Sequence, residues 1–169
     1  MDPPYFPQIT DDSCGAAVTQ MFLAEAGVTV DQHTLIGKLG ISEQQYTPKA
    51  ALKSVLSEYG FSYEEFACEG PSGVIIPERN FELMHAFVER GWLAFLNILQ
   101  LQRNGELIGH YVLAFAAHGA DSVIVHDPDP AFGPRRTLHR AELDPIWRSG
   151  LENYTRWFLA SGPTQRRML

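Results

Sequence analysis

The chain has 169 residues, 45% of them hydrophobic, which suits one globular domain with a complete core. The chain has 13 Lys and Arg residues and 20 Asp and Glu residues. The resulting formal net charge of −7 argues against nonspecific binding to nucleic acid. No stretch approaches the roughly 18 apolar residues of a membrane-spanning helix, and the first residues lack the basic and apolar regions of a signal peptide. We therefore expect a single domain over residues 1–169, with its core at about 5–160 and no membrane segment.

The cysteine count and the absence of metal-binding motifs limit the kinds of site that this sequence can form. Cys14 and Cys68 are too few for a disulfide framework, so we expect free thiols in a reducing compartment. The cytoplasm is the expected location, with export or delivery as an effector as the alternative. The sequence contains neither CxxC nor HExxH, so neither a metal site nor another cofactor is expected. The sequence leaves the oligomeric state open.

The first third of the chain has the periodicity of three helices, each followed by glycine. Polar or proline residues that favour helix starts precede each apolar pattern. Each predicted helix lies between a start signal and a closing glycine. In chain order these are Asp12 or Ser13 and Gly27, Asp31 and Gly40, and Thr47-Pro48 and Gly60.

From Phe61 onward the pattern is mainly that of strands. Trp92 to Leu101 is almost wholly apolar, as in a central strand. Asn104-Gly105 is a strong hairpin signal, which makes Leu107 to Ala116 the return strand. The other predicted elements are strands over 61–67, 74–76, 122–126, 135–139 and 154–159, a turn at 70–73, and helices near 81–88 and 142–147. The sequence therefore predicts an α+β domain, with N-terminal helices packed on a C-terminal antiparallel sheet.

The first helix carries the candidate nucleophile. Cys14 lies in the first turn, where the positive end of the helix dipole and unpaired backbone N–H groups favour a thiolate. Gln8 lies six positions upstream, and its neutral amide could swing back beside the sulfur as an oxyanion donor. The small residues Gly15, Ala16 and Ala17 leave room for a backbone or a substrate to approach closely. The alternative interpretation of Cys14 is a small, buried hydrophobic residue at a helix start.

A thiolate nucleophile needs a base and a group that orients this base. Among the histidines, His33 and His85 are expected on solvated helix faces, whereas His110 begins a strand that should enter the core. If this strand pairs antiparallel with the next one, Asp127 at the end of the second strand comes beside His110. His126 is a competing base, but period-2 alternation should put it on the opposite face. A structural strand histidine and an Asp-Pro turn residue remain the alternatives for the pair.

Four short motifs together resemble a known family. They are Pro7-Gln8, Ser13-Cys14-Gly15-Ala16-Ala17, Gly109-His110-Tyr111-Val112 and Val125-His126-Asp127-Pro128. Their order and spacing, over roughly residues 5–150, resemble the C39-like cysteine peptidases of the papain-like superfamily. These include the bacterial peptidase domains that remove double-glycine leaders from bacteriocin precursors. The resemblance implies a papain-like cysteine peptidase fold and a bacterial protein.

The resemblance also implies a role for each of four residues. Cys14 is the implied nucleophile, His110 the general base, Asp127 the residue that orients the imidazole, and Gln8 the oxyanion-hole donor. The implied reaction is hydrolysis of a peptide or protein substrate through a thioester intermediate. One alternative is a papain-like deamidase, acyltransferase or deconjugating effector that uses the same triad. A further alternative is a catalytically inactive C39-like module that only binds peptides.

Overall fold

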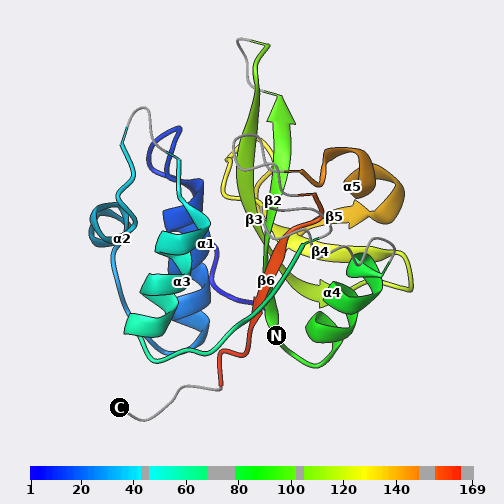
Figure 1. Ribbon diagram of the computed structural model, residues 1–169, viewed down its shortest axis with the longest axis horizontal. Helices are drawn as coiled ribbons and strands as arrows, with labels where there is room; N and C mark the ends of the chain where they lie inside the picture. Colours follow the sequence, from blue (N-terminus) through cyan, green and yellow to red (C-terminus); the bar gives the residue numbers. More distant parts are fainter. Residues whose placement is uncertain (43–45, 68–78, 102–104, 149–154, 165–169) are drawn as a thin grey trace.

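The computed structural model describes residues 1–42, 46–67, 79–101, 105–148 and 155–164, and there it contains five α-helices and a six-stranded sheet. Helices α1, α2 and α3 lie on one side of the sheet, and α4 and α5 lie on the other (Figure 1). None of the helices in the described ranges is long and apolar enough to cross a membrane. The predicted α+β class is confirmed, while Cys68 and the elements predicted at 70–73 and 74–76 lie outside the described residues.

The predicted N-terminal helices are present as α1 (Cys14–Glu25), α2 (Gln32–Leu39) and α3 (Lys49–Glu58). Asp31 caps α2 as predicted, because its carboxylate accepts a hydrogen bond from the Thr34 N–H. Ser13 stands at the N-cap position of α1, but its side chain does not cap the helix. The Ser13 hydroxyl instead accepts a hydrogen bond from the Thr10 N–H at 3.0 Å, which closes the loop before the helix. Helix α3 begins one residue later than predicted, after Pro48.

The sheet has the strand order β1-β6-β2-β3-β4-β5, and every neighbouring pair is antiparallel. The strands are β1 (Glu64–Phe66), β2 (Leu93–Leu101), β3 (Leu107–Ala117), β4 (Ser122–His126), β5 (Arg136–His139) and β6 (Phe158–Ser161). The predicted hairpin is confirmed, since Leu101 pairs with Leu107. Gly105, between these two residues, has a positive φ of 84°, a conformation that glycine adopts without steric cost.

Strands β3 and β4 pair in two registers that are separated by a bulge. On one side Ala114 lies opposite Val125, and on the other Ala116 lies opposite Ile124. One extra residue of β3 is therefore inserted between Ala114 and Ala116. Because side chains alternate along a strand, this insertion changes the phase of the alternation in β3.

Three other elements differ from the prediction. The strand expected over 61–67 is reduced to β1, because Phe61 is buried and its N–H bonds to the Leu56 carbonyl to close the end of α3. The last strand starts at Phe158 instead of 154, because Arg156 has a φ of 52° and interrupts the extended chain. Helices α4 (Asn80–Glu89) and α5 (Arg140–Ile146) were expected, but the sequence did not reveal that they cover the second face of the sheet.

The sheet divides the core into two clusters of apolar side chains. On β2, Phe95 packs with α1, α2 and α3, whereas Leu96 packs with α4 and α5. Each cluster contains one fully buried tryptophan, Trp157 in the first and Trp147 in the second. Trp92 is half-buried and packs against the second cluster. All three tryptophans therefore lie in the core or at its rim.

The start of α1 is held close to the segment before α3 at Gly15. A Cβ atom on Gly15 would lie 2.1 Å from Thr47 Oγ1 and 2.6 Å from Thr47 Cβ. Thr47 is tied to the sheet, because its carbonyl accepts a hydrogen bond from the Tyr111 hydroxyl at 3.0 Å. The close approach expected beside Cys14 is therefore made by Thr47, and only glycine leaves space for it.

We expect Gly15→Ala to destabilise the fold by about 1–3 kcal/mol, the usual cost of overpacking. This sign is opposite to helix propensity, which favours alanine over glycine by about 1 kcal/mol. Gly37→Ala in α2 is the matched control, since no atom lies within 4 Å of its added Cβ, and it should be neutral or stabilising. Urea unfolding followed by circular dichroism measures both variants. Equal unfolding midpoints for the two variants would contradict the assigned contact.

Candidate active site

Cys14 is the first residue of α1, and only 4% of its surface is exposed. The first turn of a helix has backbone N–H groups without helical partners and carries the positive end of the helix dipole. Cys14 therefore stands at the end of α1 that carries these unpaired donors. Among the described residues Cys14 is a free cysteine, so its thiol is available for chemistry.

His110 lies in β3 and Asp127 directly follows β4, and both side chains are buried, with 2% and 0% exposed. The antiparallel pairing of the two strands brings the beginning of β3 alongside the end of β4. His110 Nε2 and Asp127 Oδ1 are 2.7 Å apart, the distance of a charge-assisted hydrogen bond. The structure thus brings these two side chains together, as the strand pairing predicted, while their catalytic roles remain a prediction.

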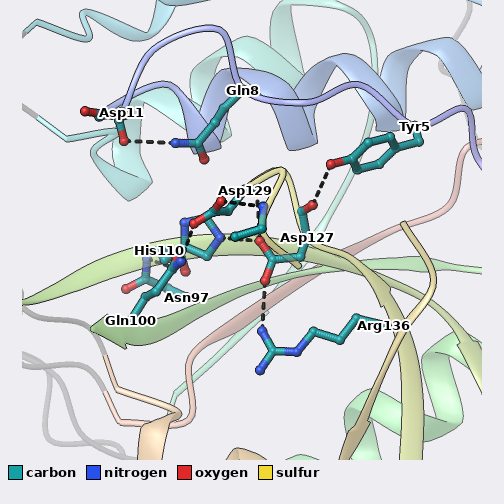
Figure 2. A network of polar contacts seen from close by, with 10 residues as sticks. Tyr5, Gln8, Asp11, Asn97, Gln100, His110, Asp127, Asp129 and Arg136 are labelled. Atoms are coloured by element: carbon teal, nitrogen blue, oxygen red, sulfur yellow. Dashed lines mark hydrogen bonds and ion pairs between the residues drawn. The ribbon is translucent and has the colours of Figure 1, made fainter. Parts of the chain in front are cut away.

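Asp127 is held by three residues besides His110. The Tyr5 hydroxyl donates to the Asp127 carbonyl at 3.0 Å, and the Asp129 N–H donates to Oδ1 at 3.0 Å. An Arg136 guanidinium N–H donates to the second carboxylate oxygen, Oδ2, at 2.9 Å. Figure 2 shows Arg136 approaching Asp127 from one side and His110 lying on the other. The carboxylate therefore has little freedom to rotate away from the imidazole.

Arg136 is a residue of the site that no sequence motif indicated. Its guanidinium lies 4.4 Å from the centre of the Phe132 ring, and its side chain is only 28% exposed, so it is held on Asp127 by packing as well as charge. A sequence signal was available, because a strand was predicted over 135–139, next along the chain from the strand that ends before Asp127. Arg136 pairs with Val125, which places its basic side chain near the carboxylate at the end of β4.

The pKa of His110 is set by two opposing effects. Burial alone lowers it, because the charged imidazolium loses its hydration. Hydrogen bonds with the Asp127 carboxylate and the Cys14 side chain, with electrostatic attraction to both groups, outweigh burial and raise the pKa to about 9. Cys14 and His110 are therefore direct neighbours. Since Nε2 is bonded to Asp127, Nδ1 is the ring nitrogen left for the sulfur.

Gln8 is held beside this pair, but its amide is already engaged. Its backbone N–H donates to the Pro128 carbonyl at 2.9 Å, immediately after Asp127. Its side-chain Nε2 donates to the Asp11 carbonyl at 3.1 Å, and its Oε1 is buried without a hydrogen-bond partner in the described part of the chain. Figure 2 shows the nitrogen turned toward Asp11 and the oxygen toward the His110 side. One of the two N–H groups of Nε2 is thus used within the loop.

Tyr46, which no motif indicated, interacts electrostatically with the thiol. Burial raises the pKa of its phenol, and the negative charges of Asp12, Glu106 and Cys14 raise it further. Asp12 lies in the loop before α1, Tyr46 in the segment before α3, and Glu106 directly before β3. Three segments that are distant in the sequence therefore contribute to the electrostatics of Tyr46.

The other histidines lie away from the thiol. His126 turns to the opposite side of β4, as period-2 alternation predicted, and its Nε2 lies 2.8 Å from the Pro3 carbonyl. Burial lowers the pKa of His126. The prediction for His85 is wrong: the side chain is buried, with Nε2 2.7 Å from the Gly119 carbonyl, because α4 packs this face against the sheet. His33 is exposed, as predicted.

The chemistry that this arrangement permits is nucleophilic. Within the described residues, no group of three or more His, Cys, Asp or Glu side chains could hold a metal ion. In such an arrangement the sulfur can attack a carbonyl carbon, and the charged imidazole, whose far nitrogen is fixed by a carboxylate, can give a proton to the leaving group. His110 interacts with Cys14 and with Asp127, and Figure 2 shows Gln8 above His110.

Comparison with solved structures finds the same fold in two peptidase domains. The peptidase domain of Streptococcus ComA, a bifunctional ABC transporter involved in quorum sensing, has a TM-score of 0.68 at 14% identity, over 94% of this chain and 96% of that chain. A double-glycine-motif protease from an AMS/PCAT transporter, in complex with the leader peptide, has a TM-score of 0.65 at 15% identity, over 95% of this chain and 91% of that one. No family model and no curated protein sequence matches. The chain therefore has the α+β fold of these peptidase domains, which is the fold that its motifs predicted.

Proposed function

We propose that this protein is a papain-like cysteine peptidase that hydrolyses a peptide or protein substrate through Cys14, His110 and Asp127. The observation that carries the proposal is the buried hydrogen bond of 2.7 Å between His110 and Asp127, with the thiol at the start of α1 as the next neighbour of His110. Buried charged groups are costly to keep unless they are well paired. Their position beside a free thiol, in a fold shared with peptidase domains, favours a catalytic role over a structural one.

Acylation begins when Cys14 Sγ attacks the carbonyl carbon of the scissile peptide bond. A sulfur–carbon bond forms, and the electron pair of the carbonyl double bond moves onto its oxygen. The carbonyl then re-forms, the carbon–nitrogen bond breaks, and His110 gives its Nδ1 proton to the leaving amine. Asp127 keeps its hydrogen bond to Nε2 throughout and so holds the imidazole in the orientation that faces the sulfur.

The negative oxygen that forms during the attack needs hydrogen-bond donors. We assign this role to Gln8 and to the backbone N–H of Cys14. Gln8 Nε2 donates to the Asp11 carbonyl and Oε1 lies toward His110, so the proposal requires the amide to turn when substrate binds and to present an Nε2 N–H to the substrate oxygen. One donor of this kind is typically worth ~3 kcal/mol of barrier.

Deacylation reverses these roles. The neutral His110 takes a proton from water through Nδ1, and the oxygen of this water attacks the thioester carbonyl. The carbon–sulfur bond breaks, an acid product leaves, and the thiolate and imidazolium are restored. No cofactor or metal enters either half of the reaction.

The proposed substrate is a peptide segment that binds in an extended form. A leader peptide is bound in one of the structures with the same fold, and the proposal extends this class of substrate to the present chain. A reduced thiol nucleophile is most durable in reducing surroundings, so we propose that the protein acts in the cytoplasm.

We expect Cys14→Ala to abolish peptide cleavage and iodoacetamide labelling at this position while the chain remains folded, because the smaller side chain suits a buried helix start. Cys68→Ala, at the chain's other cysteine, is the matched control and should retain both peptide cleavage and the labelling of Cys14. Mass spectrometry of a peptide library provides the measurement. Backbone cleavage supports the peptidase, whereas a gain of about one dalton on glutamine, or a transferred group, would identify a deamidase or an acyltransferase.

We expect kcat/KM to fall at alkaline pH, with an apparent pKa near 9. The pKa of His110, raised from 6.5 to about 9, keeps the imidazolium proton below that pH, and the proton is lost as the pH rises through it. The leaving amine then has no proton donor. Asp127→Asn removes the carboxylate that raises this pKa, so the alkaline limb of kcat/KM should move to lower pH. If the alkaline limb of Asp127→Asn lies at the same pH as that of the wild type, the assignment of Asp127 as the partner of His110 is wrong.

Arg136→Met should lower kcat/KM by about tenfold, because the Asp127 carboxylate loses the partner that limits its rotation. Arg135→Met is the matched control, since the Arg135 guanidinium pairs with Asp2 at the surface, where both side chains are more than half exposed. Arg136→Lys should recover only part of the loss, because lysine keeps the charge but not the rigid fork. Kinetic assays that find the two methionine variants equal would count against the role of Arg136.

A further inference from the structure

Gln32 is a buried amide, and three of its four hydrogen bonds go to the segment that leads into the candidate active site. It is the first residue of α2, it is only 5% exposed, and neither its type nor its spacing drew attention in the sequence. Its Oε1 accepts hydrogen bonds from the Ile9 N–H at 3.0 Å and from the Ser13 hydroxyl at 3.1 Å. Its Nε2 donates to the Pro7 carbonyl at 3.0 Å and to Gln20 Oε1 at 3.2 Å. Both lone pairs and both N–H groups of the amide are thus used.

These bonds hold the main chain on both sides of Gln8. Pro7 and Ile9 are its immediate neighbours, and both are bound to the one amide of Gln32. From the opposite direction, the Gln8 N–H is bound to the Pro128 carbonyl. Gln8 is therefore fixed between α2 and the end of β4, two elements that belong to different layers of the fold.

The same amide also reaches the start of α1. The Ser13 hydroxyl lies within hydrogen-bond distance of both the Thr10 carbonyl and Gln32 Oε1, and Cys14 is the next residue. One side chain thus links the residue proposed as the side-chain oxyanion donor with the helix start that supplies the nucleophile. A shift of about 1 Å at such a group is enough to cost a large factor in rate.

We propose that Gln32 is a positioning residue for the oxyanion site: it holds the loop of residues 7–13 so that the Gln8 amide and the Cys14 backbone N–H face one substrate oxygen. The inference rests on the proposed peptidase function. Pro7 and Ile9 are exposed, so water can replace the lost bonds when Gln32 is substituted. The loss therefore affects the placement of Gln8 more than the presence of the fold.

The test compares Gln32→Met, which removes all four hydrogen bonds at similar volume, with Gln8→Ala and with the double variant. Gln8→Ala should lower kcat by about 100-fold, the usual effect of losing one oxyanion donor, and Gln32→Met by about tenfold or more. The double variant should lose clearly less than the product of the two single losses, because Gln32 acts in large part through Gln8. Gln20→Met is the matched control: it leaves Gln32 its bonds to Pro7, Ile9 and Ser13, and kcat should stay near that of the wild type.

A second readout separates positioning from general damage. Alkylation by iodoacetamide occurs at a saturated carbon and develops no oxyanion, so its rate at Cys14 should stay within about twofold of wild type in Gln32→Met. A parallel loss of alkylation and turnover would overturn the inference, as would additive effects in the double variant. An inactive but alkylated wild type would refute the peptidase function instead.

A measurement without substrate tests the inference independently of turnover. Hydrogen exchange of the Gln8 N–H, which is bonded to the Pro128 carbonyl, should speed up about tenfold or more in Gln32→Met. Unchanged protection of this N–H would reject the positioning role even if the enzyme had slowed. If Gln32→Met does not fold, Gln32→Glu is the variant to measure, because it keeps the acceptor for the Ile9 N–H but loses the donor to the Pro7 carbonyl. The exchange rate of the Gln8 N–H should then be faster than in the wild type, but by less than the roughly tenfold expected for the loss of all four bonds.

Discussion

The interaction on which the rest of the site depends is the buried hydrogen bond between His110 and Asp127. Burial removes both groups from water, and each charge then needs compensation within the protein. Arg136 and the Asp129 N–H supply it on the Asp127 side, and Cys14 supplies it on the His110 side. The imidazole thus has partners on both sides of its ring, and the carboxylate has partners at both of its oxygens.

These contacts require that the two layers meet at one place. Cys14 belongs to the helical layer, whereas the other groups belong to β3, the turn after β4, and β5. The N-terminal segment joins the layers, because Tyr5 and Gln8 bond to the main chain of Asp127 and Pro128 while Gln32 binds the same segment from α2. The loop before α1 therefore belongs to the site as much as the helix that follows it.

The parts of this arrangement that local patterns encode could be predicted from the sequence. The N-cap Asp31, the continuous apolar run of β2 and the glycine after Asn104 each act on their own neighbours, so the elements beside them were found close to their true bounds. The approach of Asp127 to His110 was predictable as well, because consecutive strands usually pair antiparallel and alternation then fixes which side chains share a face.

The rest depends on partners that are distant in the sequence. Ser13 has the composition of a helix cap, yet its hydroxyl bonds within the loop and to Gln32. His85 lies among polar neighbours, yet its face of α4 packs on the sheet. Gln32 itself looks like a surface residue until the chain folds back over it. In each case a tertiary contact outweighs the local preference of the residue.

The bulge in β3 has a consequence for how this strand can change over evolutionary time. On the site side of the bulge Ala114 lies opposite Val125, a register that puts His110 and Asp127 on the same face. If the register of Ala116 and Ile124 ran through the whole strand, the side chains of His110 and Asp127 would lie on opposite faces of the sheet. A one-residue deletion that imposed this register would therefore separate the two side chains, so the length of this strand, independently of its composition, is a heritable determinant of whether His110 and Asp127 meet.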